Sequence, residues 1–285
     1  MRRLFGTDGI RGIFNEEPVT PEMGRKVGRA VVRYFGREGT QPRIVVGRDT
    51  RLSGKSLQDA IVSGILSMEG EAILVGELPT PGLAYVTRDL GAEAGIMISA
   101  SHNPYEYNGF KIFSHEGYKL GDEAESQIED LIFSDTVPSA LEEALALAGE
   151  QEMGQAGERY LSFLQHTLRK GYSFENMKII LDCAHGATCR VAPVLFERMG
   201  AEVESLFVTP DGKNINRGCG SQHPETLSER VLETSAHVGI AFDGDGDRMV
   251  AVDEKGNVLT GDQVLLICAK TLKDQGELKN NLVVS

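Results

Sequence analysis

The sequence of 285 residues contains no tryptophan, and only 6% of its residues are aromatic. Stacking on nucleic-acid bases and the interfacial belts of membrane proteins rely on such side chains, so neither partner is indicated. No apolar run approaches the roughly 18 residues of a membrane-spanning helix. Residues 1–8 reach glycine and aspartate before any apolar segment forms, so we expect no secretory signal peptide. We therefore expect no membrane partner and no nucleic-acid partner.

Cysteine is also scarce. Its four copies, at positions 183, 189, 219 and 268, form no C-x-x-C pair and lack the density of a disulfide framework. They are expected to be reduced structural thiols, as in a cytoplasmic protein. A formal net charge of −13 would repel nucleic acid and anionic lipid. A small phosphorylated molecule is not excluded, because a local cluster of Arg and Lys can outweigh the overall charge.

Short apolar segments alternate with helical patterns along the chain. Residues 43–49 form an apolar run that ends in glycine and charge, which indicates a buried strand. A helical pattern containing Leu57 and Ile61 follows, and residues 72–75 indicate a second strand, closed by a Thr-Pro turn at residues 79–81. This βαβ order predicts a mainly parallel sheet covered by helices.

The same order recurs later in the chain. It comprises a strand, a helix, a second strand and a Thr-Pro turn at residues 178–182, 192–198, 203–208 and 209–212. Each repeat also has a helix before it. Thr20 and Thr260 stand where the N-cap residues of two such helices are expected. The predicted fold class is therefore α/β, with repeated domains whose mixed, mainly parallel sheets are sandwiched by helices.

A third copy of the repeat begins near the end of the sequence. Residues 282–285 indicate its first strand, and a lone strand cannot bury both faces, so we expect the chain to be part of a longer protein. Residues 134–157 are acidic and rich in Ala and Glu, which indicates a helix followed by an interdomain connection. We predict domains at residues 1–150, 151–252 and 253–285.

A serine lies in a loop that directly follows a buried strand. Residues 95–98 indicate the strand, and the loop at residues 99–104 has the sequence SASHNP. The carboxyl ends of strands are where α/β sheets place ligands, although an ordinary strand-to-turn junction would also explain these residues. A Ser-His-Asp hydrolase is not favoured, because Ser101 and His102 are adjacent with divergent side chains and the G-x-S-x-G elbow is missing.

A second loop carries three aspartates at alternate positions. Asp243, Asp245 and Asp247 are separated by glycines and flanked by apolar runs that indicate strands. Such carboxylates repel one another unless a cation lies between them. An EF-hand also begins D-x-D-x-D, but its sixth position requires glycine and Arg248 stands there. Three carboxylates suit octahedral Mg²⁺ with room for a phosphate oxygen, which Arg248 could contact.

Four segments, taken together, resemble the α-D-phosphohexomutase family. They are residues 7–12, 99–104, 108–111 and 243–248, and their order along essentially the whole chain matches that of the family. The family has four domains around a central cleft, of which the first three are similar α/β units and the fourth binds phosphate. The resemblance implies that Ser101 is a phosphoserine whose phosphate completes the Mg²⁺ site of the three aspartates. It also implies that the transferring group is surrounded by Arg11, His102, Lys111 and Arg248.

The resemblance also implies a reaction. Residues 5–12 and 214–224 resemble members that act on glucosamine phosphates. Such a protein would be an isomerase of amino-sugar metabolism, interconverting glucosamine 6-phosphate and glucosamine 1-phosphate through a bisphosphorylated sugar. Lys111 is the first candidate for proton transfer, whereas His102 has a supporting hydrogen bond within its loop as an alternative role.

Other interpretations of the function stay open. A phosphomannomutase or phosphoglucomutase would carry the same loops, and so would a non-catalytic module that is phosphorylated on Ser101. The family's remaining sugar- and phosphate-binding loops do not occur in the sequence, so the chain by itself is expected to be inactive. Its expected partner is a small phosphosugar, and the sequence leaves open whether the protein forms a homodimer.

A basic stretch follows the first buried strand. We expect Arg51 and Lys55 to lie in a solvated loop, and we leave open whether Arg48 attracts a phosphorylated substrate. His185, which follows another strand, is expected to be structural.

Overall fold

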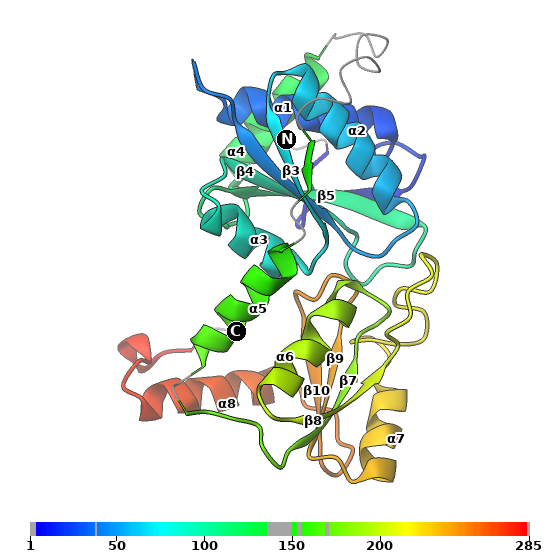
Figure 1. Ribbon diagram of the computed structural model, residues 1–285, viewed down its shortest axis with the longest axis vertical. Helices are drawn as coiled ribbons and strands as arrows, with labels where there is room; N and C mark the ends of the chain where they lie inside the picture. The colour runs from blue at the N-terminus through cyan, green and yellow to red at the C-terminus, as the bar shows by residue number, and fades with distance from the viewer. Residues whose placement is uncertain (1–3, 38, 136–149, 153–154, 169–170, 284–285) are drawn as a thin grey trace.

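The computed structural model describes residues 4–37, 39–135, 150–152, 155–168 and 171–283. Two sheets, each covered by helices, lie one beyond the other along the longest axis of the molecule (Figure 1). None of the helices in these ranges is long and apolar enough to cross a membrane.

The first sheet has six strands in the order β1-β5-β4-β2-β3-β6. In chain order they are β1 (Ile10–Ile13), β2 (Arg43–Arg48), β3 (Glu71–Glu77), β4 (Ala94–Ile98), β5 (Tyr107–Ser114) and β6 (Glu150–Glu152). Strands β4, β2, β3 and β6 pair in parallel, whereas β5 runs antiparallel to both of its neighbours. This arrangement confirms the predicted mixed, mainly parallel sheet.

Helices cover both faces of the first sheet. One face packs against α1 (Pro21–Phe35), α2 (Gly54–Ser67) and α4 (Asp122–Phe133), and the other against α3 (Thr80–Asp89) and α5 (Ala156–Thr167). The side chains of strand β2 show the division, because Ile44 and Val46 join the first core and Val45 joins the second. A period of two residues, with both sets apolar, is what a doubly covered strand requires.

The second sheet has four strands in the order β10-β9-β7-β8. They are β7 (Lys178–Asp182), β8 (Glu202–Leu206), β9 (Val238–Phe242) and β10 (Met249–Asp253), and only the β9–β10 pair is antiparallel. Helix α7 (Glu225–Thr234) packs on one face, and helix α6 (Ala192–Arg198), with the 3₁₀ turn η2 (Ala187–Arg190) before it, packs on the other. The second copy of the repeat is therefore confirmed as a smaller α/β unit.

Two helix starts confirm the predicted N-caps. The side chain of Thr20 accepts a hydrogen bond from Met23 N at the start of α1. Thr260 does the same for Gln263 N at the start of α8 (Gly261–Asp274), where Gln263 also bonds back to the Thr260 backbone. Each cap satisfies amide groups that the first helical turn leaves without intrahelical partners.

The expected turn at residues 79–81 is wrong in one respect. Thr80 begins helix α3, and Pro81 lies in its first turn, where a missing N–H costs no hydrogen bond. The helix expected within residues 134–157 falls mostly on residues 136–149, which lie outside the described residues; residues 150–152 form strand β6 instead.

The expected third unit begins with helix α8, none of whose residues is buried. Of the strand expected at residues 282–285, residues 284–285 lie outside the described ranges, and residues 282–283 follow the short 3₁₀ turn η3 (Lys279–Asn281) without strand structure. Division of the chain near residues 150 and 253 stays a proposal. Strand β6 pairs with β3, and α5 contacts helices of both units, so the first division lies in a region that the two units share.

Candidate functional site

The serine loop and the aspartate loop meet between the two sheets. The serine loop leaves β4 at its carboxyl end, and the aspartate loop joins β9 to β10. Ser101 Oγ donates a hydrogen bond of 2.6 Å to Asp243 Oδ2, and both residues are fully buried. The two loops follow the carboxyl ends of β4 and β9, which belong to different sheets. Their meeting brings together two residues that are 142 positions apart in the chain.

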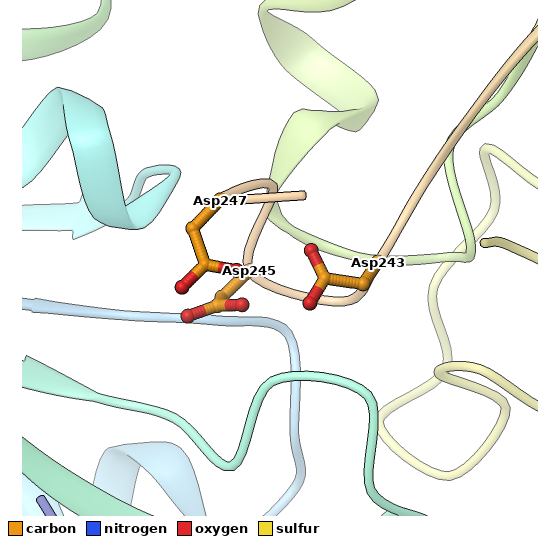
Figure 2. Close-up of side chains that lie close together, drawn as sticks. All are labelled: Asp243, Asp245 and Asp247. Atoms are coloured by element: carbon orange, nitrogen blue, oxygen red, sulfur yellow. The ribbon is translucent and has the colours of Figure 1, made fainter. Parts of the chain in front are cut away.

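The three aspartates converge within one turn of chain (Figure 2). One oxygen from each carboxylate lies within 4.8 Å of the others; Asp243 and Asp245 are buried, while Asp247 is exposed. The glycines between them are required by the geometry. Gly246 has a φ of +66°, and a Cβ atom on Gly244 would lie only 2.7 Å from the carbonyl oxygen of Ser101.

Lys111 neutralises part of this negative charge. It lies on β5 opposite Met97 of β4, and its Nζ is 2.7 Å from Asp245 Oδ2 and 3.0 Å from Asp247 Oδ2. The carboxylate of Asp8, at 3.1 Å, is a third neighbour. Burial alone would lower the pKa of Lys111, but the carboxylates of Asp245, Asp247 and Asp8 outweigh it and raise the pKa.

The aspartates themselves differ in acidity. Burial, reinforced by the charge of Asp245, raises the pKa of Asp243 to about 6. Burial also acts to raise the pKa of Asp245, but the attraction and hydrogen bond of Lys111 overcome it and hold that pKa below its usual value. A carboxylate kept ionised in a buried cluster is a suitable ligand for a hard cation.

One atom tests whether the residues fit a metal ion. Asp245 Oδ2 accepts hydrogen bonds from Lys111 and from Thr80 Oγ1, at 2.7 and 2.5 Å. Asp245 Oδ1, in contrast, is buried with no hydrogen-bond partner among the residues that the structure describes. A buried carboxylate oxygen without a donor is costly unless something else coordinates it. The donor set of three carboxylates therefore fits a hard divalent cation.

Arg248 joins the two loops. Its guanidinium donates hydrogen bonds to Ser101 Oγ and, at 3.0 Å, to Asp243 Oδ2. The same Nη2 lies 2.5 Å from Nδ1 of His102. Burial, together with the positive charge of Arg248, lowers the pKa of His102, so its ring is neutral at pH 7 and Nδ1 can accept.

Arg11 reaches this group only indirectly. It lies on β1, and its guanidinium pairs with Asp8, whose carboxylate also contacts Lys111. Among the residues selected from the sequence, one connected network of contacts links Ser101, His102, Lys111, Arg248 and the three aspartates. Arg11 stands at the edge of that cluster.

The expectation for Arg51 is wrong. Only 1% of Arg51 is exposed, and it donates hydrogen bonds to backbone carbonyls of the serine loop instead of lying in a solvated loop. Lys55 is exposed, as expected, but it lies in the first turn of helix α2 instead of a loop, where it pairs with Asp59. Arg48, left open above, pairs with Glu77 at 2.8 Å. His185 accepts a hydrogen bond from Thr209 N at 3.2 Å and packs edge-on against Phe207, in keeping with a structural role.

Three further residues of the site were not selected from the sequence. Asp8 pairs with Lys111, Thr80 donates to Asp245, and Asn216 donates to the carbonyl of Ser101 at 2.9 Å. Each lies in a motif described above for another reason: Asp8 in residues 7–12, Thr80 in the Thr-Pro segment and Asn216 in residues 214–224. The four cysteines are free thiols, as expected.

Comparison with known proteins gives a consistent result. The sequence profile of the phosphoglucomutase/phosphomannomutase alpha/beta/alpha domain I matches residues 2–138, and that of domain II matches residues 158–256. Phosphoglucosamine mutase of Syntrophus aciditrophicus is 56% identical over 284 residues, and that of Syntrophobacter fumaroxidans is 48% identical over 285 residues. Each alignment covers 100% of this chain but only 63% and 64% of those relatives.

A solved structure supports the same assignment. The crystal structure of a phosphoglucomutase/phosphomannomutase family protein from Burkholderia thailandensis matches with a TM-score of 0.77 and 26% identity, covering 95% of this chain and 59% of that one. The chain thus spans a little under two thirds of the length of the proteins it resembles. Since two successive domains of one family account for most of its residues, the chain belongs to the phosphoglucomutase/phosphomannomutase family, the α-D-phosphohexomutases.

Proposed function

We propose that the protein to which this chain belongs is a phosphoglucosamine mutase, which interconverts glucosamine 6-phosphate and glucosamine 1-phosphate. The observation that carries the proposal is the hydrogen bond of 2.6 Å between Ser101 Oγ and Asp243 Oδ2, inside a buried cluster of carboxylates and cations. This contact supports a serine that carries a phosphoryl group beside a cation site. The relatives at 48% and 56% identity bear the name phosphoglucosamine mutase, which supports the amino-sugar substrate.

Asp243, Asp245 and Asp247 are the residues proposed to hold Mg²⁺. Magnesium bound there would draw negative charge from the oxygens of the phosphoryl group during transfer. The choice of Mg²⁺ rests on the all-oxygen donor set, which excludes soft metals, and on the phosphate chemistry of the family.

Ser101 is proposed to divide one exchange into two transfers. In the first, the bond between phosphorus and Ser101 Oγ breaks, and a bond forms between phosphorus and the free hydroxyl oxygen of the sugar phosphate. The hydroxyl proton leaves to a base, and Ser101 Oγ gains a proton. In the second transfer, the other phosphoryl group of the bisphosphorylated sugar returns to Ser101 by the reverse steps.

The cationic side chains are proposed to bind and orient the transferring group. Arg248 already donates to Ser101 Oγ, so its guanidinium is in position to bind phosphoryl oxygens on that atom. Lys111 Nζ holds a proton beside the aspartates, and it is our candidate for the group that protonates the departing oxygen. His102 Nδ1 faces Arg248 and is proposed to fix that guanidinium, while Arg11 is proposed to contribute charge at the edge of the site.

The experiment that tests the proposal uses the full-length protein. Intact-mass measurement should find one phosphoryl group on Ser101, and the protein should convert glucosamine 6-phosphate in the presence of Mg²⁺. Ser101→Ala should lack both the phosphate and the activity, whereas Ser162→Ala, an exposed serine on α5, should keep both. Normal turnover by Ser101→Ala would rule the mechanism out.

The same preparation separates the alternatives. Higher kcat/KM for mannose 6-phosphate or glucose 6-phosphate than for the amino sugar would identify a phosphomannomutase or phosphoglucomutase. Phosphate on Ser101 without turnover of any hexose phosphate would indicate a phosphorylatable module. Whether the protein forms a homodimer is measured by sedimentation of the same sample.

A further inference from the structure

Arg51 lies beneath the serine loop with all of its hydrogen-bonding capacity used. A guanidinium carries five N–H donors, one on Nε and two on each Nη. Nε donates to Asp49 Oδ2 at 2.9 Å. Nη1 donates to the carbonyls of Pro104 and, at 3.0 Å, Tyr107, and Nη2 donates to those of Ser101 and Asn103 at 2.9 and 2.8 Å.

Every one of these four carbonyls belongs to the segment between residues 101 and 107. That segment comprises most of the loop between β4 and β5 together with Tyr107, the first residue of β5, and it carries Ser101 and His102. Because Arg51 is 1% exposed and its charge is balanced by the equally buried Asp49, a substrate phosphate cannot reach it. Its contacts therefore act on the shape of the loop and not on the substrate.

Asn216 holds the same loop from the second sheet's side. Its side-chain amide donates to the carbonyl of Ser101 at 2.9 Å and to that of Asn103 at 3.1 Å. The carbonyl of Ser101 thus accepts from two side chains that reach it from different units of the fold. Asn216 has a φ of +57°, a conformation that asparagine tolerates better than most residues.

The backbone of Ser101 needs this support. Its φ of +55° lies in the left-handed region, which L-residues avoid unless the surrounding structure enforces it. The Ser101 amide donates to Ser99 Oγ at 2.9 Å, and Ser99 Oγ donates to Asp49 Oδ2 at 2.6 Å. Asp49 thereby connects the amide side of Ser101 to Arg51, which holds the carbonyl side.

We propose that Arg51 is a positioning residue for phosphoryl transfer, which, with Asn216, fixes the Ser101 backbone so that Oγ faces Asp243. The inference rests on the proposed function, because it assigns a purpose to the direction of Ser101 Oγ. Lysine cannot replace Arg51 in this role. An ammonium has three donors and no planar fork, so at least two of the five hydrogen bonds would be lost.

The test compares three variants of the full-length protein. Arg51→Lys keeps the charge next to Asp49 but loses hydrogen bonds to the loop. Asn216→Gly removes the amide and tolerates the positive φ. Lys55→Ala is the matched control, because it removes a nearby positive charge that is exposed and does not contact the loop. The readouts are the single-turnover rate constant for transfer from phospho-Ser101, KM, and hydrogen exchange of peptides covering residues 99–109 and 238–252.

We expect Arg51→Lys to lower the single-turnover rate constant about 100-fold and Asn216→Gly to lower it about 10-fold. KM should change less than about threefold in both variants, because a small misplacement of a reacting atom affects transfer more than binding. Exchange should rise in residues 99–109 and stay unchanged in residues 238–252. Lys55→Ala should match the wild type in every readout. A purely structural role would lower the amplitude of the single turnover but leave its rate constant unchanged.

A rate constant within twofold of wild type in a folded Arg51→Lys protein would overturn the proposal. If Arg51→Lys does not fold, Asn216→Gly decides by the same criterion. Absence of any transfer in the wild type would contradict the proposed function and, with it, the role of Arg51 in transfer. Unchanged hydrogen exchange of residues 99–109 in Arg51→Lys would instead contradict this inference alone, because it would show that Arg51 does not fix the loop.

Discussion

Asp182 is a buried carboxylate at the end of β7, where it pairs across the sheet with Ala241 of β9 and is not one of the three clustered aspartates. Its two oxygens accept hydrogen bonds from Ala184 N at 2.8 Å and Gly220 N at 2.7 Å. Burial nevertheless raises its pKa from 3.8 to about 6. Between these two values the folded protein binds a proton that the unfolded chain releases, so the stability that this group contributes falls as pH rises.

The change Asp182→Asn tests this linkage, because asparagine does not titrate. As pH rises from 3.8 to about 6, we expect the wild type to lose up to about 3 kcal/mol of stability relative to Asp182→Asn. The size follows from the shift in pKa, because each pKa unit corresponds to about 1.4 kcal/mol. Urea denaturation across that range measures it. Asp59→Asn, at an exposed carboxyl on α2, should give a curve parallel to wild type. Parallel curves for Asp182→Asn would contradict the raised pKa.

Individual site residues could be predicted from sequence only where their signal is local. Ser101 lies among small residues after an apolar strand, and the aspartates alternate with glycines, so a few neighbouring positions suffice to select them. Arg51 gives no such signal. Its partner at Ser101 is 50 positions away, and that of Asn216 is 115 positions away. A buried arginine whose acceptors are distant carbonyls has the same local sequence as a solvated one.

At the scale of elements, the closest packing is between α1 and α2. A Cβ atom on Gly28 would lie 2.3 Å from the carbonyl oxygen of Ile61, and one on Gly64 would lie 2.1 Å from that of Arg25. Both contacts are with helix backbone, which cannot move without separating the helices. The two glycines therefore set the distance at which α1 and α2 cover the first sheet.

Gly64→Ala is accordingly expected to destabilise the protein by about 3 kcal/mol, because overpacking forces the helices apart and disturbs the core below them. Thermal and urea denaturation measure the loss. Gly157→Ala provides the control, since Gly157 lies on helix α5 and, apart from its chain neighbours and its own helix backbone, no described atom lies within 4 Å of the added Cβ. That control should be neutral or stabilising by up to about 1 kcal/mol, as alanine favours helix. Equal stability of Gly64→Ala and wild type would disprove the close contact.

Some strands and helices could be predicted from their local sequence, and others could not. Strands β2, β3, β7 and β9 are short apolar runs with clear ends, and all were predicted. Strand β5 was not, because it buries Asn108 and Lys111 beside its apolar residues and so lacks a simple pattern. Helix α3 was missed for a different reason. Its Thr-Pro start is also a common turn sequence. The helix is stabilised by the packing of Leu83 and Val86 against the sheet, which is a tertiary contact that the local sequence does not reveal.

At the scale of the whole molecule, the candidate cation site lies where the two units of the fold meet. The aspartates belong to the second sheet's unit, while Ser101, Lys111 and Thr80 belong to the first. A cation bound by the aspartates would relieve their mutual repulsion in the folded protein and would have no comparable site in the unfolded chain. Binding should therefore raise the stability of the folded state.

Asp247→Asn tests this stabilisation, because Asp247 is the most accessible of the three aspartates and its loss disturbs the buried contacts least. Mg²⁺ at 100 times its Kd should stabilise the wild type by about 2.7 kcal/mol, which corresponds to a rise in Tm of about 5 °C. The Tm of Asp247→Asn should rise little under the same conditions. Differential scanning fluorimetry with and without MgCl₂, against KCl of equal ionic strength, measures the shift. Asp253→Asn, at the far end of β10, should retain the full rise. A rise of the same size in Asp247→Asn would place the stabilising cation elsewhere on the protein.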